Sequence, residues 1–250
     1  MLEKTLSRLN MKGSLNALES ISKIKDKIEF VQALLQAECD YREQKAFERK
    51  LKQASFPIDK VWSEINPALN PEIDFKSVQA LGDGEFIRKK ENICLMGTQG
   101  TGKSHSLIAL GRQLCDDGYS VKFYRACDLV NALEEAKSQH KLDRFMKSIL
   151  KPQLLIIDEL GYVPFTENGA RLLFDVFSRR YEYGSIGVST NLSFEKWVQV
   201  FGSVELTAAL VDRFTHRSHN FVYNGESIRL MEAQERAIRE RHSKNSRGKK

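Results

Sequence analysis

The stretch "GTQGTGKS", residues 97–104, matches the pattern GxxxxGK[ST], in which glycines let the backbone turn successive N–H groups toward phosphate oxygens. The apolar run "ICLM" ends directly before Gly97, and a helical pattern starts near Gly102. A strand, a loop and a helix in this order are what a phosphate cradle requires. A plain glycine-rich turn is the weaker interpretation, so the stretch predicts a phosphate-binding loop.

The residue types in this loop assign roles. Lys103 would reach the β and γ phosphates of a nucleoside triphosphate, and Ser104 would hold Mg²⁺. The ring of His105 is expected to pack or to form a hydrogen bond, and we do not assign it to catalysis. The expected nucleotide-binding residues are Gly97, Thr98, Gln99, Gly100, Thr101, Gly102, Lys103, Ser104 and His105.

A second motif, "LLIIDE" at residues 154–159, is typical of a buried strand that ends in two carboxylates. Asp158 can hold magnesium, and Glu159 can orient and deprotonate an attacking water. Ligands of open parallel sheets bind at the carboxyl ends of the strands. We therefore expect Asp158 and the loop at Gly97 to meet there.

Three polar residues further along the chain complete the candidate set. Asn191 ends the strand-like run "SIGVSTN" and is placed to contact the γ phosphate or the water, although an ordinary strand-end turn is the alternative. Arg213 and Arg229 could neutralise charge on the transferred phosphoryl group, one of them from a neighbouring subunit. Surface arginines are common, so a solvated role stays open for each.

The order of apolar patterns predicts the fold class. From residue 92 onward, five short β-prone runs alternate with helical segments: "NICLMG", "SVKFYRA", "QLLIIDE", "SIGVSTN" and "HNFVYN". This alternation predicts an α/β fold with a mainly parallel sheet and helices on both faces. Up to about residue 52, apolar residues recur every three or four positions, which predicts two or three helices.

Prolines and charge place the boundaries between these parts. Pro57, Pro67 and Pro71 break any long helix and mark a connector. We expect a helical domain at 1–55, a linker at 56–90, a nucleotide-binding domain at 91–241 and a basic tail at 242–250 that is disordered until bound.

The net charge of +6 comes from the two ends of the chain. Residues 61–230 hold 20 basic and 21 acidic residues, whereas residues 1–60 hold 12 against 9 and residues 231–250 hold 7 against 3. Basic flanks favour a polyanionic partner, but a solubilising role is an equal alternative.

One basic stripe lies within the N-terminal helical region. Its members fall within an arc of about 80° at 100° per residue, and they are Arg42, Lys45, Arg49 and Lys52. Such a stripe could track a DNA backbone. Glutamates at 38, 43 and 48 lie among these residues, so a solvated face with intrahelical ion pairs is at least as good an interpretation.

Composition excludes several other classes of protein. No apolar stretch approaches the roughly 18 residues that a membrane span needs, and residues 1–10, "MLEKTLSRLN", lack the uninterrupted apolar segment of a secretory signal. The four cysteines, at 39, 94, 115 and 127, have no metal-ligand spacing and are expected to be reduced. We therefore expect a cytoplasmic protein with no membrane partner.

The motifs together resemble one family. "ENICLMGTQGTGKSHS", "LLIIDELGYVPF", "RRYEYGS", "STNLSFEKW", "DRFTHR" and "GESIR" occur in the order found in the IstB-like ATP-binding proteins of bacterial insertion sequences. The resemblance implies an AAA+ P-loop ATPase of the initiator and DnaC-type helicase-loader clade. In such a fold a parallel five-stranded sheet is flanked by helices and preceded by a small all-helical domain.

The family's properties imply a function for this chain. Such proteins use ATP and Mg²⁺, assemble as homo-oligomers on duplex DNA with little sequence preference, deform the target, and recruit and stimulate a transposase. Hydrolysis controls disassembly, and the ATP sites lie at subunit interfaces.

The resemblance also carries roles onto residues of this sequence. Lys103 and Ser104 match the phosphate-binding pair, Asp158 and Glu159 the magnesium and water-activating pair, and Asn191 the sensor asparagine. Arg213 matches the arginine that acts on a neighbour's site, with Arg217 as the second candidate, and Arg229 matches the arginine that closes over the nucleotide. Thr98, Gln99, Ser106 and Ile228 depart from the usual family residues, and none of these departures removes a catalytic group.

Two other functions share the same loop. A DnaC-type helicase loader would have the same ATPase motifs and would prefer single-stranded to duplex DNA. A small-molecule P-loop kinase is the weaker alternative, because the adjacent carboxylates of "DE" favour water as the attacking group and a kinase has no need of a basic helical extension.

Overall fold

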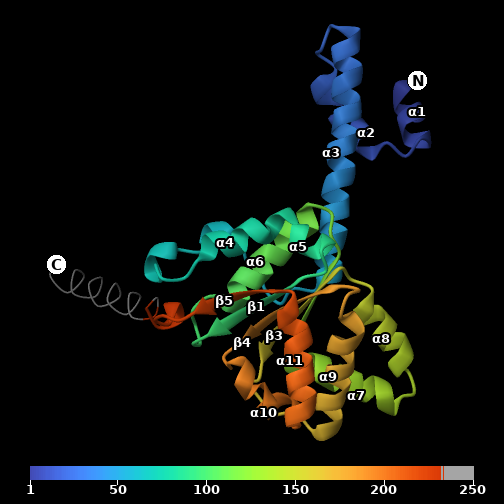
Figure 1. Ribbon diagram of the computed structural model, residues 1–250. Helices are drawn as coiled ribbons and strands as arrows, with labels where there is room; N and C mark the ends of the chain where they lie inside the picture. The colour runs from blue at the N-terminus through green and yellow to red at the C-terminus, as the bar shows by residue number, and fades with distance from the viewer. Residues whose placement is uncertain (232, 234–250) are drawn as a thin grey trace, which may run out of the picture. The chain divides into compact units, whose positions relative to one another are not determined.

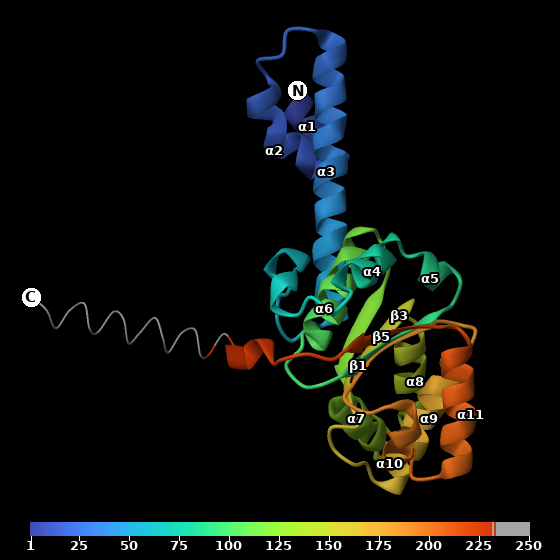
Figure 2. The same cartoon turned by 60° about the vertical axis from the view of Figure 1, so that its left-hand side comes forward.

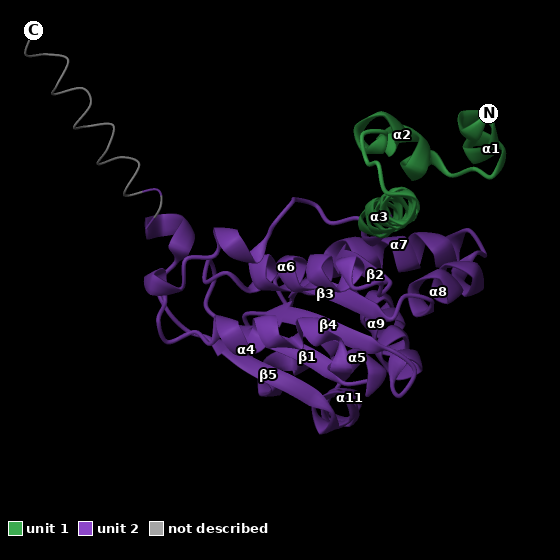
Figure 3. Cartoon of the chain, turned by 90° about the horizontal axis from the view of Figure 1, so that it is seen from above, with its two compact units in different colours: residues 1–52 green, residues 53–250 purple. Residues whose placement is uncertain are grey.

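The structure is a computed structural model that describes residues 1–231 and 233 (Figure 1). The chain divides into two compact units, Met1–Lys52 and Gln53–Lys250 (Figure 3). The basic tail expected at 242–250 and the expected domain end at 241 lie outside the described residues. The first boundary expected from the sequence, between residues 55 and 56, lies three residues beyond the division between the units.

The first unit is all helical. It consists of α1 (Leu2–Arg8), α2 (Lys12–Ile21) and most of α3 (Lys27–Ala54). Glu38 of α3 accepts the backbone N–H groups of Gly13 and Ser14 at 2.7 and 3.2 Å. A carboxylate at the start of α2 satisfies donors that have no partner within the helix and interacts favourably with its dipole. This buried contact joins α2 to α3.

The connector that the prolines indicate contains only short elements. Two 3₁₀ turns, η1 (Trp62–Glu64) and η2 (Pro67–Leu69), precede α4 (Phe75–Ala80), η3 (Leu81–Asp83) and α5 (Glu85–Arg88). Pro67 stands at the first position of η2, where a missing N–H costs nothing. The chain then enters the sheet.

The second unit is built on a five-stranded parallel sheet, which confirms the predicted fold class (Figure 1). Its strands are β1 (Asn92–Gly97), β2 (Val121–Arg125), β3 (Leu154–Leu160), β4 (Ser185–Thr190) and β5 (Ser218–Tyr223). Their order in the sheet is β2-β3-β4-β1-β5. The strand β4 therefore lies between β1, which leads into the phosphate loop, and β3, which carries the two carboxylates.

Helices cover both faces of this sheet. Besides α4 and α5, they are α6 (Lys103–Asp116), α7 (Ala126–Ser138), α8 (Leu142–Leu150), α9 (Glu167–Arg180), α10 (Val198–Phe201) and α11 (Val204–His216), with η4 (Phe194–Trp197) before α10. Figures 1 and 2 show α4, α5 and α6 on one face and α7 to α11 on the other. The parallel strands are buried between these layers, as their apolar runs predict.

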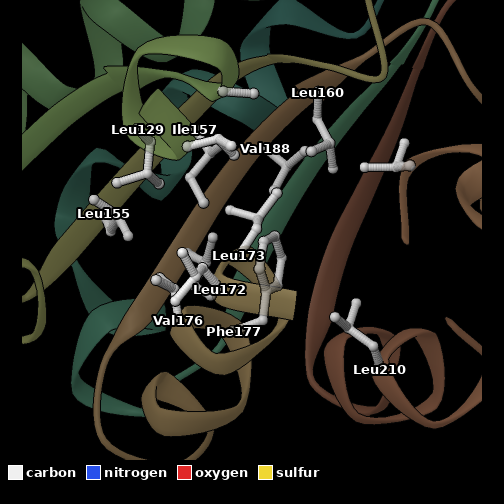
Figure 4. Close-up of a cluster of buried hydrophobic side chains, with 14 of the residues drawn as sticks. Leu129, Leu155, Ile157, Leu160, Leu172, Leu173, Val176, Phe177, Val188 and Leu210 are labelled. Atoms are coloured by element: carbon white, nitrogen blue, oxygen red, sulfur yellow. The ribbon is translucent and has the colours of Figure 1, made fainter. Parts of the chain in front are cut away.

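The main core fills the space between β3, β4 and the α7–α11 layer (Figure 4). Ile157 and Val188 from the sheet pack in the same buried cluster as Leu129 of α7 and Leu173 and Phe177 of α9. Burial of such side chains stabilises the fold by about 1.5 to 3 kcal/mol each.

Arg180 lies at the amino ends of β3 and β4. Its guanidinium is 1% exposed and donates to the carbonyls of Ile149, Pro152, Gln153 and Ser185 at 2.8 to 3.1 Å. Burial lowers the pKa of Arg180 to about 10. Carbonyl acceptors replace the water that a buried cation loses, so this side chain ties the starts of β3 and β4 together.

Candidate nucleotide-binding site

The loop at residues 97–102 takes a conformation that its glycines permit. Gly97, Gly100 and Gly102 have φ of +140°, +78° and +98°. A Cβ at Gly97 would lie 2.3 Å from the Tyr223 carbonyl oxygen, and one at Gly100 would lie 2.1 Å from Ser227 Oγ. Thr101 is fully buried, and its hydroxyl donates to the Thr98 carbonyl at 2.8 Å. The loop is thus a tight turn that ends at the start of α6.

Lys103, the first residue of α6, bends back over this loop. Its Nζ donates to the carbonyls of Gly97 and Thr98 at 2.9 and 2.5 Å. Burial lowers the pKa of Lys103 to about 8, Asp158 raises it in part, and Arg229 lowers it further. A partly desolvated ammonium at a helix N-terminus suits an anionic ligand.

This pKa sets a pH dependence for ATP binding. With a pKa of about 8, Lys103 is mostly protonated near pH 7 and mostly neutral near pH 9 in the free protein. A bound polyphosphate favours the ammonium, so ATP binding should take up protons at pH 8 to 9 and affinity should fall by up to about tenfold per pH unit above 8. Isothermal calorimetry in two buffers of different ionisation enthalpy measures both.

Lys103→Arg is the control, because a guanidinium stays charged over this range. In that variant the remaining affinity should not change between pH 7.5 and 9. Equal wild-type affinities at these two pH values would contradict the prediction.

Ser104 and Asp158 meet as the two motifs predict. Ser104 Oγ donates to Asp158 Oδ1 at 2.7 Å, and Asp158 is 4% exposed. Ser189 Oγ also donates to this carboxylate oxygen. A hydroxyl and a carboxylate are hard oxygen ligands, which fits Mg²⁺ completed by water and phosphate. No cluster of three or more His, Cys, Asp or Glu ligands occurs in the part of the chain that the structure describes.

The motif suggested that β3 ends at Glu159, but the strand continues to Leu160. The φ of Glu159 is +60°, in the left-handed region that residues other than glycine rarely adopt. The side chain is 46% exposed, and Oε2 lies 4.0 Å from Arg125 Nε. The backbone N–H of Glu159 donates a hydrogen bond to Ser189 Oγ at 2.9 Å. The carboxylate is therefore open to solvent, whereas its backbone is held.

Several of the expected residues line one pocket of about 390 Å³, which lies in the size range of small-molecule sites, whereas Asp158, Gly97, Thr98 and Thr101 are not among its lining residues. Five expected residues that line it are Lys103, Ser104, Glu159, Asn191 and Arg229. Gln99, Gly100, Gly102 and His105 line it as well. Segments that are far apart in the sequence thus converge at the carboxyl edge of the sheet.

The segment that carries Arg229 is tied directly to the phosphate loop. Thr98 Oγ1 donates to the Gly225 carbonyl at 3.1 Å, and the Ile228 N–H donates to the Gly100 carbonyl at 3.0 Å. The position of Arg229 is therefore coupled to the conformation of the loop itself.

Arg213 and Arg217 do not line this pocket. Arg213 is exposed near the end of α11 and borders a small cavity with Asn92 and Ile186, which lie at the starts of their strands. The backbone carbonyl of Arg217 accepts the Asn92 N–H at 2.7 Å. Both arginines thus lie near the amino ends of the strands, at the side of the sheet opposite the pocket.

The basic stripe of α3 is partly neutralised. Arg42 Nε lies 2.6 Å from Glu38 Oε1, and Lys45 Nζ lies 2.7 Å from Glu48 Oε2. Intrahelical ion pairs of this kind are what the solvated-face interpretation predicts. A DNA contact by Arg42, Lys45, Arg49 and Lys52 stays a prediction.

Sequence reasoning missed several pocket residues. They are Ile58, Lys60, Tyr162, Ser189, Thr190 and Ile228. Phe56 and Trp62 of the connector at 56–90 do not line the pocket. Phe56 packs on Phe123, and Trp62 Nε1 donates to Gln113 Oε1 at 2.9 Å. The ring of His105 makes the expected hydrogen bond, at 3.0 Å from the Val61 carbonyl. An apolar residue beside a break in the helical pattern was the only sequence signal for Ile58.

All four cysteines are free thiols. Across residues 1–231 and 233, no helix has the length and apolar character that a membrane crossing needs.

Comparisons with known proteins agree on one family. The model described as "IstB-like ATP binding protein" matches residues 4–236. The chain is 36% identical over 242 residues to the "Insertion sequence IS21 putative ATP-binding protein" of Pseudomonas aeruginosa, covering 95% of this chain and 91% of that protein. It is also 36% identical over 204 residues to the corresponding protein of insertion sequence IS5376 from Geobacillus stearothermophilus, covering 82% and 81%.

Solved structures share the fold. A crystal structure of a DNA replication initiation factor matches with a TM-score of 0.55 at 21% identity and covers 66% of this chain and 50% of that chain. The DnaC helicase loader matches with a TM-score of 0.51 at 17% identity and covers 70% and 98%. At these identities the likeness shows an AAA+ P-loop fold and nothing of function.

Proposed function

Because the chain belongs to the IstB-like ATP-binding protein family, we propose that it hydrolyses ATP with Mg²⁺ and uses the cycle to assemble on duplex DNA as a transposition helper. The observation that carries the proposal is the single pocket shared by the phosphate loop, Glu159, Asn191 and Arg229. The relatives' names supply the insertion-sequence context.

The pocket residues divide the chemistry among them. Lys103 and the loop N–H groups would bind the β and γ phosphates, and Ser104 with Asp158 would hold Mg²⁺, which would neutralise charge on the phosphate oxygens. Glu159 orients a water and accepts its proton, while Asn191 and Arg229 fix the γ phosphate. His105 holds the connector beside the pocket through the Val61 carbonyl.

The location of Arg213 argues for homo-oligomers. A side chain near the far edge of the sheet can complete only a neighbour's site, so ATP would stabilise the contact between two copies. A head-to-tail contact of this kind builds rings or filaments. An ordered array multiplies weak contacts to the DNA backbone, and hydrolysis then loosens the array.

A basic face at the end of α8 is our first candidate for the DNA contact. Arg144 and Lys147 of α8 and its C-cap residue Lys151 are exposed and fall within an arc of about 60°. None of the three forms an ion pair with another described residue, unlike Arg42 and Lys45 of α3. Cations without counter-charges neutralise phosphates and release counterions. Because Arg42 and Lys45 are already paired with glutamates, we rank the α3 stripe second.

Paired charge removals separate the two helices. Arg144→Gln with Lys147→Gln should lower the slope of log affinity against log salt by about 1.8 on duplex DNA, whereas Arg42→Gln with Lys45→Gln should lower it by less. Fluorescence anisotropy at five salt concentrations measures the slope. A larger effect of the α3 pair would reverse our ranking. If neither pair changes the slope, neither face contacts the DNA backbone.

The wider proposal is that the array deforms its DNA target without base reading and then recruits and stimulates a transposase in the bacterial cytoplasm. Bending a target costs several kcal/mol, which repeated backbone contacts can supply. A DnaC-type helicase loader is the alternative, and the shared fold does not distinguish the two.

Sedimentation with each nucleotide tests the proposal. We expect large complexes on duplex DNA with ATP or a non-hydrolysable analogue and small ones with ADP. Preference for single-stranded DNA would favour the helicase loader. Assembly to the same extent with ATP, the analogue and ADP would overturn the proposed link between the pocket and the array.

A further inference from the structure

Ser189 of β4 contacts both carboxylate residues of β3 through a single hydroxyl. Ser189 is 1% exposed. Its Oγ donates to Asp158 Oδ1 and accepts the backbone N–H of Glu159 at 2.9 Å. Asp158 Oδ1 also receives the hydroxyl of Ser104 at 2.7 Å. A hydrogen-bonded chain therefore runs from the phosphate-loop helix through Asp158 and Ser189 to the backbone of Glu159.

The strand register explains why one residue faces two. Ile157 pairs with Val188, and the pairing resumes between Leu160 and Thr190. Two residues of β3 therefore lie opposite Ser189 alone, which is the arrangement of a β-bulge. In a regular strand, consecutive side chains point to opposite faces. The bulge instead lets Asp158 contact Ser104 while Glu159 borders the same pocket.

Hydroxyl groups replace the ladder bonds that the bulge interrupts. Ser189 Oγ accepts the N–H of Glu159, as described above. On the other side of the bulge, Thr190 Oγ1 donates to the Leu160 carbonyl at 2.7 Å and accepts the Leu192 N–H at 3.0 Å. The backbone on each side of Glu159 is thus fastened to β4, although the carboxylate itself is exposed.

We propose that Ser189 is a positioning residue for ATP hydrolysis, which holds Glu159 in its left-handed conformation and fixes the Asp158 carboxylate toward Ser104. The inference rests on the proposed ATPase activity. Ser189 acts through these two residues and does not react itself. Without its hydroxyl, the Glu159 N–H loses its acceptor and Asp158 loses one of two donors, so the bulge is held to β4 only on the Leu160 side.

Two serine-to-alanine variants of the same strand make a matched test in the full chain. We expect Ser189→Ala to lower the kcat of ATP hydrolysis by about ten- to hundredfold, since a displacement of about 1 Å can cost that much. The Kd of a fluorescent ATP analogue should change less than about threefold, because the loop is untouched. Ser185 is also fully buried in β4, and its Oγ has no hydrogen-bond partner among the described atoms. Ser185→Ala should leave kcat and Kd unchanged.

Two further variants separate positioning from a loss of folding. Ser189→Thr keeps a hydroxyl in a β-branched side chain that suits a strand, and it should restore most of kcat. In Ser189→Ala with Glu159→Gln, the losses in kcat should be clearly less than additive, because part of the serine's effect acts through the glutamate. Thermal unfolding midpoints of all variants accompany the kinetics.

The outcomes distinguish the two levels of the proposal. A wild-type protein that hydrolyses ATP together with an equally active Ser189→Ala variant would overturn the role of Ser189 and leave the proposed function intact. Additive losses in the double variant would show a general structural effect and overturn it as well. A wild-type protein without ATPase activity would remove the proposed function and this inference with it.

Discussion

Replacing Glu159 by Gln should lower the ATP turnover number by about 10²- to 10⁴-fold. The amide keeps the size of the side chain but cannot accept a proton from water. Lys103, Ser104 and the loop are unchanged, so the Kd for ATP should stay within about threefold of the wild-type value. The protein should then remain on duplex DNA in the presence of ATP, because hydrolysis no longer loosens the array. Phosphate release and sedimentation measure the two effects.

Glu182→Gln is the matched control for this experiment. Glu182 has a φ of +65°, close to that of Glu159, and it is exposed outside the pocket. The same substitution there should change neither turnover nor assembly. If Glu159→Gln hydrolyses ATP at the wild-type rate, Glu159 is not the base, and water must be activated by another group.

Replacing Arg213 by Ala should lower turnover by about 10³-fold or more, the usual effect of losing a charge-neutralising arginine. The loss should occur without a matching loss of ATP affinity, because Arg213 lies outside the pocket of its own chain. Arg217→Ala is the comparison, since Arg217 is the second candidate for this role. A larger loss in Arg217→Ala would transfer the role to that residue.

Mixing two inactive variants tests whether Arg213 acts between subunits. Lys103→Ala loses the phosphate-binding group but keeps Arg213, whereas Arg213→Ala keeps a complete pocket. At random mixing in equal amounts, about a quarter of the head-to-tail contacts regain both groups, so a corresponding share of the wild-type rate should return. Mixtures no faster than the separate variants would place the arginine's action within one chain or exclude it from the reaction.

The fold was predictable because its determinants are local. The five strands have the expected positions within about two residues, since short apolar runs buried between two helical layers leave a recognisable pattern. The connector contains only short elements, as Pro57, Pro67 and Pro71 indicate. The ends of β3 were less predictable, because a bulge at Glu159 extends the strand past the two carboxylates.

The pocket was only partly predictable. Glycines at positive φ and a lysine at the start of a helix follow from one motif, so the tight turn before α6 could be predicted, and its binding of phosphate stays a prediction. Ile58 and Tyr162 could not, because the sequence does not indicate which connector segments approach the loop. The stripe on α3 was ambiguous for the same reason, since only side-chain conformations decide whether Arg42 contacts Glu38 or a ligand.

The sequence by itself determined the phosphate loop, the parallel sheet and the identity of the two carboxylates, because each depends on backbone preferences and apolar spacing within about ten neighbouring residues. Only the tertiary structure decided that β4 lies between β1 and β3, that Ser189 faces both Asp158 and Glu159, and that Arg213 lies near the opposite edge of the sheet from the pocket. The reason is physical. A strand's register and neighbours are set by packing across the whole sheet, and a one-residue shift there redirects every side chain that follows.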